Sequence, residues 1–415
     1  MVRGQRFVFT LVVAVTVSGC AFLGRASVSS GPNHTQTAVT SSHPSISRSG
    51  RFVAFASADP NLVVGDTNGT SDVFVHDNVA DTTERWSTTP ANGQSAGVNT
   101  QPSISDNGRF VAFTSTATDL APDGNDGTST DVFVKDRTTG NVFLVSVSVG
   151  EAGADQPMNI PASNPAISGD GNSVAFQILA TRQVVDGPPL PPLPYGPFVR
   201  HINAGRTVLM AGTTLGTYII VTGYDLSDDG TIVVYHEVNA AGFTGITRVG
   251  DGTTGVIVGD IESHSVSAEA TFPPAAVTVS GDGTRFAAIA NPATGNATLR
   301  WGSTSDPSHP TETSALPVSQ AAFLSTDGTI LGWQTTFVAG PIAIVRSLPN
   351  PASKIVTRTV DGGRVVNGGE IAMSADGKWF AFVSADDHLV VNDTNGASDV
   401  FTRSVDEHFP IPTPA

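Results

Sequence analysis

Short apolar runs alternate with turn-forming residues along the whole chain. The segment 44–77 has two such runs around the turn Ser47-Arg48-Ser49-Gly50, followed by a polar loop and a third run. The same order returns at 102–136 and at 371–404. Apolar runs of roughly four to eight residues bounded by Gly, Pro and Asp are typical of β-strands. No segment longer than about ten residues has the 3.6-residue apolar period of a helix, so the pattern predicts an all-β protein.

A Ser-x-(Asp/Ser/Asn)-Gly motif followed by an apolar strand marks seven copies of this unit. Successive glycines of the motif are 45 to 63 residues apart. Glycine can adopt a positive φ in a hairpin turn, and the Ser and Asp side chains can bind backbone amides of the turn. The apolar run that follows does not alternate, which predicts a strand covered on both faces. The seven pairs are Ser47/Gly50, Ser105/Gly108, Ser168/Gly171, Ser227/Gly230, Ser280/Gly283, Ser325/Gly328 and Ser374/Gly377.

These copies resemble the TolB-like propeller repeat, also called the PD40 or WD-type repeat. The resemblance implies four-stranded antiparallel blades stacked around a channel, and seven copies imply a single seven-bladed β-propeller over residues 37–408. The seventh copy supplies three strands before a tail, 409–415, that we expect to be disordered. We therefore expect an N-terminal strand, Thr37–Ser42, to be the outer strand of the last blade and to close the ring.

Residues 1–19 have the layout of an export signal, with Arg3 and Arg6 before a short apolar run. The sequence Val17-Ser18-Gly19-Cys20 resembles a bacterial lipobox, which implies cleavage before Cys20 and lipidation of its sulfur. An ordinary secretory signal and an uncleaved anchor are the alternatives. We expect an exported lipoprotein in the periplasm or on the outer face of a bacterial membrane, attached through its lipid. Residues 20–36 would be a flexible tether between that lipid and the propeller.

Composition narrows the set of partners. The chain has 37 acidic and 21 basic residues, for a net charge of −16, which disfavours binding to nucleic acid. Cys20 is the only cysteine, so neither a disulfide nor cysteine catalysis is expected once it is lipidated. We expect a monomer whose partner is a protein, a peptide or a glycan.

Three copies carry an acidic loop between their second and third strands. Oxygen ligands at alternate positions around a glycine turn suit Ca²⁺, the one cofactor that the sequence suggests. The alternative is an Asx-turn in a long hairpin, with the last Asp of each loop capping backbone amides. The three copies become neighbours when the ring closes, so we expect any cation or partner site on that arc. The candidate ligands are Asp66, Asn68, Asp72, Asp123, Asn125, Asp131, Asp393, Asn395 and Asp399.

A basic residue recurs in the third strand of every copy, which suggests an anionic ligand. The third strand of a blade lies away from the channel, however, so we expect most of these residues to pair with carboxylates or to cover apolar surface. The set is His76, Lys135, Arg200, Arg248, Arg300, Arg346 and Arg403.

No catalytic set can be assigned. The GxSxG sequence at 93–97 lies in a polar connection between copies, whereas a nucleophile elbow needs a strand before it and a helix after it. We therefore expect a non-catalytic binding or scaffold module with its ligand at the top face or in the channel. The alternative is a lyase or glycosidase acting on envelope or environmental polysaccharide at the channel mouth. Titratable residues at that mouth would favour the enzyme.

Overall fold

We describe a computed structural model of the 415-residue chain. It describes residues 23–405, except 31–34, 122–128, 150–154, 159, 179–196, 211–218, 240–243, 266–275, 291–296, 317–318, 338–339, 349–352, 358–364, 366–367 and 391. All regular elements in this part of the chain are β-strands. None of these segments forms a helix that is long and apolar enough to cross a membrane.

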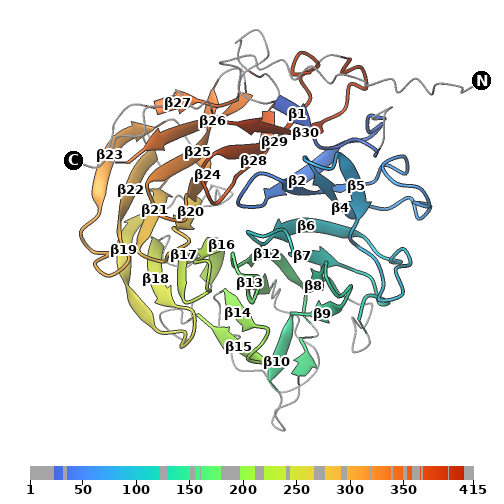
Figure 1. The fold of residues 1–415 in the computed structure, drawn as a ribbon. Coiled ribbons are helices and arrows are strands. Elements are labelled where there is room, and N and C mark those ends of the chain that lie inside the picture. Colours follow the sequence, from blue (N-terminus) through green and yellow to red (C-terminus); the bar gives the residue numbers. More distant parts are fainter. Residues whose placement is uncertain are drawn as a thin grey trace, which may run out of the picture.

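Seven four-stranded antiparallel sheets are arranged as blades around a central axis (Figure 1), as the repeats predict. A separate hairpin, β10 (Val147–Val149) and β11 (Asp155–Pro157), follows blade two. From the innermost strand outward, blades one to three are β2 (Ser41–Ile46), β3 (Phe52–Ser57), β4 (Asp72–Asp77) and β5 (Thr82–Arg85); β6 (Asn99–Ile104), β7 (Phe110–Ser115), β8 (Asp131–Asp136) and β9 (Val142–Leu144); and β12 (Ala162–Ile167), β13 (Ser173–Ile178), β14 (Phe198–His201) and β15 (Arg206–Leu209). Blades four to seven are β16 (Ile219–Leu226), β17 (Ile232–Asn239), β18 (Thr244–Asp251) and β19 (Ile257–Ser265); β20 (Ala276–Val279), β21 (Arg285–Ala290), β22 (Ala297–Ser303) and β23 (Thr311–Leu316); β24 (Ser319–Leu324), β25 (Ile330–Phe337), β26 (Gly340–Ser347) and β27 (Ser353–Ile355); and β28 (Gly368–Met373), β29 (Trp379–Ser384), β30 (Asp399–Ser404) and β1 (Leu23–Arg25).

The Ser-x-x-Gly motif forms the turn between the first two strands of each blade. All seven glycines have φ between 64° and 79°, the left-handed region that favours glycine. In blade one, the amide of Phe52 donates to Ser47 Oγ at 3.0 Å, and the other six turns repeat this contact. The predicted chemistry of the turn is therefore confirmed.

These glycines also let neighbouring blades approach closely. A Cβ atom at Gly108 would lie 2.2 Å from the Phe52 ring of blade one. One at Gly50 would lie 2.2 Å from the Trp379 ring of blade seven. The turn of one blade thus rests on the start of the second strand of the blade before it, and any side chain would push the two apart.

The hydrophobic core consists of layers between adjacent blades. Seven clusters of buried apolar side chains each combine residues of two neighbouring blades. Strand β3 is buried at every residue, and β7 and β29 are buried at every residue but the first, which confirms the prediction for these runs without alternation. Stacked rings such as Phe55 and Phe74, with centroids 5.8 Å apart, join the second and third strands within a blade.

An N-terminal strand does complete the last blade, but it is not the predicted one. Strand β1 pairs with β30, with Leu23 opposite Arg403 and Arg25 opposite Phe401. Residues 41 and 42 instead begin β2, the innermost strand of blade one, so the assignment of Thr37–Ser42 to blade seven was wrong. The segment expected to be a tether therefore contains the closing strand. The predicted signal sequence, Cys20 and the tail 409–415 lie outside the described residues.

Candidate functional site

The innermost strands of blades one to three share an unusual backbone feature near their beginnings. His43, Gln101 and Asn164 have φ of 52–53°, which is uncommon for residues other than glycine, and each precedes a proline. A residue before proline normally takes an extended conformation. These positions are therefore unfavourable for two reasons, the positive φ and the proline that follows. The pairing register shifts at each of them, which marks a β-bulge. Residues in sparsely populated backbone conformations are enriched at functional sites, where the surrounding structure holds them in place.

The three bulges border a cavity of about 440 Å³ that also touches blades four and seven. We call it the axial pocket. Its lining has one carboxylate, one imidazole, several amides and three prolines, without any Lys or Arg. The lining residues are His43, Pro44, Gln101, Pro102, Asn164, Pro165, Ala166, Gln177, Thr222, Gly223, Tyr224 and Glu370.

A hydrogen-bond network holds the pocket side chains of blades two to four. Gln101 Nε2 donates to Asn164 Oδ1 at 2.5 Å, and the backbone amide of Asn164 donates to Gln101 Oε1 at 3.0 Å. Thr114 Oγ1 also donates to Gln101 Oε1, at 2.9 Å. The Tyr224 hydroxyl donates to the Asn164 carbonyl, and burial raises the pKa of Tyr224, so the phenol stays a neutral donor. These contacts fix the side-chain amides of Gln101 and Asn164 before any ligand binds.

On the other side of the pocket, blades seven and one meet through His43 and Glu370. The His43 amide donates to Glu370 Oε2 at 2.5 Å, and His43 Nε2 lies 3.6 Å from Glu370 Oε1. His43 Nδ1 lies 2.9 Å from Ser42 Oγ. The two side chains are 38% and 50% exposed, so they can reach a ligand in the pocket.

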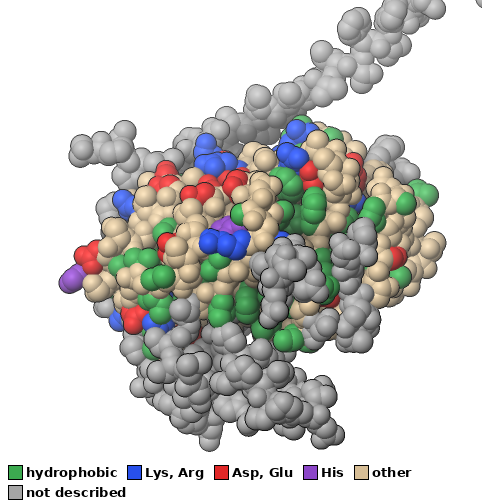
Figure 2. Space-filling view, turned by 90° about the horizontal axis from the view of Figure 1, so that it is seen from below, with side chains coloured by type: hydrophobic (Ala, Val, Ile, Leu, Met, Phe, Trp, Pro, Cys, Tyr) green, Lys and Arg blue, Asp and Glu red, His purple; other side chains and the backbone are tan. Residues whose placement is uncertain are grey.

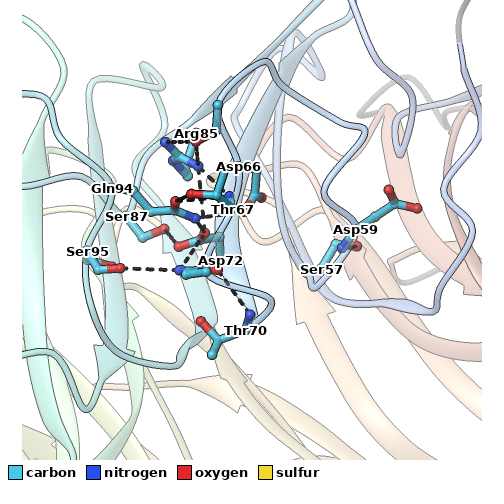
Figure 3. Close-up of polar contacts among 12 residues, drawn as sticks. Ser57, Asp59, Asp66, Thr67, Thr70, Asp72, Arg85, Ser87, Gln94 and Ser95 are labelled. Atoms are coloured by element: carbon cyan, nitrogen blue, oxygen red, sulfur yellow. Dashed lines mark hydrogen bonds and ion pairs between the residues drawn. The ribbon is translucent and has the colours of Figure 1, made fainter.

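The acidic loop of blade one is organised around Arg85 (Figure 3). Arg85 Nη1 lies 3.7 Å from Asp66 Oδ1 and 4.0 Å from Asp72 Oδ2. Gln94 Nε2 donates to the same two oxygens, at 2.7 and 3.0 Å. Burial raises the pKa of Asp72, although hydrogen bonds from Ser87 and Gln94 act in the opposite direction. The Arg85 guanidinium and the neutral N–H donor of Gln94 therefore contact the two carboxylate oxygens that a cation would bind.

Blade seven repeats this arrangement with the N-terminal segment. Arg25 Nη2 lies 3.1 Å from Asp393 Oδ2, and Arg25 Nε lies 3.6 Å from Asp399 Oδ2. Asn395 Nδ2 donates to Asp399 Oδ2 at 2.8 Å. Asn395 Oδ1 accepts from the Ala397 amide at 3.0 Å, as Asn68 Oδ1 accepts from the Thr70 amide in blade one. These two contacts are the Asx-turns of the alternative interpretation.

The last Asp of each loop acts through a serine rather than directly on the backbone. In blade one, Ser87 Oγ donates to Asp72 Oδ1 and accepts from the Val73 amide. Ser146 makes the same two bonds with Asp131 and its neighbour in blade two, and Ser27 makes them with Asp399 in blade seven. In all three blades a serine hydroxyl therefore links the aspartate to the backbone amide of the next residue.

Blade two differs from its neighbours at the arginine position. Leu144 lies opposite Phe133, where Arg85 and Arg25 lie opposite the corresponding phenylalanines. Asp123 and Asn125 lie outside the described residues. Calcium binding thus stays a prediction, and the contacts in blades one and seven favour the turn interpretation there. Asp386, Asp387 and His388 bring three potential ligand atoms within 4.8 Å of one another, but Asp386 already accepts from the His388 amide.

Most of the third-strand basic residues have partners within the fold. Arg248 bonds Glu237 at 2.9 Å and Asp260 at 2.8 Å, and Arg346 lies 5.5 Å from the centre of the Trp333 ring. The Lys135 ammonium donates to the Thr88 hydroxyl, and among the residues described no carboxylate lies within ion-pair distance of it. On the edge of the disc shown in Figure 2, acidic and basic side chains are interspersed rather than gathered by sign.

None of Gln101, Asn164, Tyr224, Glu370 and His43 was predicted from the sequence to be a site residue. A signal was available for three of the five. The copies HPSIS, QPSIS and NPAIS place a variable polar residue before a fixed proline, where the repeat itself needs none. Tyr224 and Glu370 follow no shared motif, so only the assembled ring brings them to the pocket.

Comparisons with known proteins support the fold. No family model matches the chain, and no curated protein matches it in sequence. A solved oligogalacturonate lyase in complex with manganese is 12% identical, with a TM-score of 0.55 over 94% of this chain and 97% of that one. The β-propeller domain of the Trilobed protease from Pyrococcus furiosus is 11% identical, with a TM-score of 0.50 over 88% of this chain and 92% of that one.

TolB from Acinetobacter baumannii is also similar, at 11% identity over 81% of this chain and 60% of that one, with a TM-score of 0.38. A score this low carries no argument about function. The fold class is nevertheless defined: the chain forms seven four-stranded blades, and a solved β-propeller domain is among its structural neighbours. The Pyrococcus domain is described as having an open velcro topology, whereas β1 closes the last blade of this chain. A fold of this kind does not by itself specify a function, so the site must decide it.

Proposed function

We propose that this protein is a lipid-anchored extracytoplasmic binding module that holds a short neutral glycan in the axial pocket. The observation that carries the proposal is the set of strained, polar residues in the bulges of three consecutive blades. Their amides offer paired donors and acceptors, which suit the hydroxyl groups of a sugar. Pro44, Pro102 and Pro165 add apolar faces, and the volume lies within the roughly 300–1,000 Å³ of small-molecule sites.

The export and anchoring part of the proposal rests on the sequence. Val17-Ser18-Gly19-Cys20 follows a short apolar run with a basic start, the layout of a lipoprotein signal. We infer an extracytoplasmic, monomeric protein, for which a glycan of the envelope or of the surroundings would be an accessible ligand.

The test uses the chain from residue 21 and a panel of neutral and uronic-acid oligosaccharides in isothermal titration calorimetry. Gln101→Gly removes the pocket amide and accommodates the positive φ, so the free energy of unfolding should change by less than about 1 kcal/mol. We expect this variant to bind a neutral oligosaccharide at least about tenfold more weakly than the parent.

Asn203→Ala is the matched control, because Asn203 is exposed in the blade-three turn, away from the pocket lining. It should bind like the parent. The proposal fails if no oligosaccharide binds, or if Gln101→Gly and Asn203→Ala bind equally well.

A polysaccharide lyase or glycosidase is the second candidate, and the His43–Glu370 pair favours it. An imidazole 3.6 Å from a carboxylate, both open to the pocket, is an arrangement used in general acid–base catalysis. The same panel should then yield new reducing ends or unsaturated sugars, and His43→Gln should lose this activity while it keeps binding. If the parent cleaves none of the oligosaccharides that it binds, the enzyme is excluded for those ligands.

A further inference from the structure

A second cavity lies on the side of the disc, between the outer strand of blade one and the third strand of blade two. Its volume is about 640 Å³, and we call it the lateral groove. It shares no lining residue with the axial pocket. The groove is lined by Val63, Val64, Thr83, Glu84, Arg85, Trp86, Thr88, Asn92, Lys135, Arg137, Thr138, Thr139 and Gly140.

Lys135 is a buried cation without a neutralising carboxylate. The residue is 6% exposed, and its Nζ donates to Thr88 Oγ1 across the blade boundary. Among the described residues, no carboxylate lies within ion-pair distance of this ammonium. Burial lowers the pKa of Lys135 to about 8, with Glu84 acting in the opposite direction. A buried charge with only a hydroxyl partner is costly, and an anionic ligand would remove that cost.

The corresponding basic residue in the third strand of blade four has carboxylate partners. Arg248 is also buried, but Glu237 and Asp260 neutralise it at 2.9 and 2.8 Å. Lys135 pairs with Val111 on one side and Val142 on the other, so neither flanking strand places a carboxylate opposite it. The third strand of a blade can therefore hold a buried cation between carboxylates, as blade four does for Arg248, whereas blade two gives Lys135 only a hydroxyl.

Arg137 adds a second cation that is held in place and remains accessible. Its guanidinium lies 4.5 Å from the centre of the Phe52 ring, and its Nη2 lies 3.8 Å from Glu84 Oε2. The side chain is 35% exposed, and Glu84 is 56% exposed, so solvent weakens that ion pair. Arg85 also lines the groove, but its guanidinium forms ion pairs with Asp66 and Asp72.

We propose that the lateral groove binds the anionic group of a small molecule, a carboxylate or a phosphate, between Lys135 and Arg137. Charge-assisted bonds from an ammonium and a guanidinium are the usual means of holding such groups. Thr88, Thr139 and Asn92 supply neutral hydrogen-bonding groups around them. The site lies in a protein of net charge −16, so attraction is local to the groove and falls as salt screens it. This proposal does not depend on glycan binding in the axial pocket.

Calorimetry with inorganic phosphate, glucuronate and glucose tests the site and separates its two ligand sources. We expect phosphate or glucuronate to bind the chain from residue 21, glucose not to bind the groove, and the affinity to fall with added salt. Lys135→Met should weaken anion binding at least about tenfold and should fold, since an apolar replacement of a buried ion is often neutral. Lys378→Met removes an equal charge from an exposed turn and should leave the affinity unchanged.

A second variant and an acetylation experiment test the same site independently of Lys135→Met. Arg137→Gln changes a partly exposed residue and should also weaken anion binding, while Gln101→Gly in the axial pocket should not. The chain has three lysines, Lys135, Lys354 and Lys378, so acetylation can be mapped at each by mass spectrometry. Phosphate or glucuronate should slow acetylation of Lys135 alone. The proposal is overturned if neither anion binds, if Lys135→Met and Lys378→Met bind alike, or if the anions do not protect Lys135.

Discussion

The second residue of each Ser-x-x-Gly turn forms a ring at the end of the axis where the innermost strands finish. Backbone bonds link these turns from blade to blade, such as the Arg48 amide to the Asp106 carbonyl at 3.0 Å. Arg48 Nη1 lies 2.9 Å from Asp106 Oδ2 and 3.5 Å from Asp228 Oδ2. A Cβ atom at Gly169 would lie 2.7 Å from Asp228 and 2.9 Å from Asp106, so glycine leaves room for both carboxylates. The Arg48 guanidinium therefore lies within ion-pair distance of both carboxylates.

The carboxylates in this ring should lower the free energy of unfolding at neutral pH. Burial and then repulsion by Asp228 raise the pKa of Asp106 to about 6, although Arg48 acts in the opposite direction. A carboxyl with a raised folded pKa binds protons in the native state first, so stability falls as pH rises from about 4 to about 6. Asp106→Asn should therefore raise the free energy of unfolding by about 1–2 kcal/mol at pH 8 and by little at pH 4.

Urea unfolding at the two pH values checks this, with the exposed Asp387→Asn as the control for a lost surface charge. The control should change stability by less than about 0.5 kcal/mol at both pH values. A stabilisation by Asp106→Asn that is equal at pH 4 and pH 8, or a loss of stability at pH 8, would contradict the assignment.

At the scale of residues, the sequence predicted the turn chemistry but not the axial pocket. Ser47 and Gly50 act within five residues of each other, so a local motif contains the whole interaction. The bond between His43 and Glu370 joins positions 327 residues apart, and its geometry exists only after the ring has closed. A cation or partner site was expected on the arc of blades seven, one and two, and this stays a prediction. The axial pocket includes residues of these three blades and also of blades three and four.

At the scale of elements, the closing strand is the main difference from the prediction. Arg25 and Ser27 repeat the roles of Arg85 and Ser87, and the bridge between Val28 and Gln36 repeats the bridge between Thr88 and Gln94. The shared Arg-x-Ser sequence was therefore the available signal. It was missed because the apolar pattern of a three-residue outer strand is too short to stand out from a polar segment.

Removing the closing strand should destabilise the propeller. A chain of residues 37–408 lacks β1 and Arg25, which leaves Asp393 and Asp399 without their guanidinium and the edge of β30 unpaired. Compared with a chain of residues 21–408, we expect a loss of about 3–5 kcal/mol, the usual effect of leaving a buried charge unpaired. The thermal midpoint of unfolding measures the difference.

Arg25→Gln in the longer chain separates the ion pair from the strand and should account for part of that loss. If residues 20–36 were only a tether, both chains and the variant would unfold at the same temperature. Equal midpoints would thus show that β1 does not close the ring in solution.

At the scale of the whole molecule, the position of β1 places the proposed lipid close to one blade. Three peptide units separate Cys20 from Leu23, and a fully extended chain covers at most about 11 Å over that distance. A tether of residues 20–36 would instead let the propeller turn freely. Blade seven, with β1 and β30, lies far around the ring from blade three, with β14 and β15 (Figure 1). The anchored molecule should therefore hold blade seven near the membrane and blade three away from it.

Single cysteines can test this orientation, because Cys20 is the only native cysteine and lipidation would occupy its sulfur. Thr394→Cys lies in the exposed loop of blade seven, and Asn203→Cys lies in the exposed turn of blade three. Each would carry a fluorophore, in vesicles whose lipids contain a quencher. We expect stronger quenching at position 394 than at position 203, because β1 allows the anchored chain little freedom.

Cys20→Ser distinguishes a wrong orientation from a missing lipid, since this variant should not be recovered with membranes at all. Equal quenching at the two positions in a membrane-bound protein would contradict the short connection and favour a free tether. Insertion of sixteen Gly and Ser residues after Cys20 should itself equalise the two positions, because a flexible linker of that length reaches roughly 20–24 Å on average. The contrast between the native and the lengthened chain would show that the closing strand orients the axial pocket relative to the membrane.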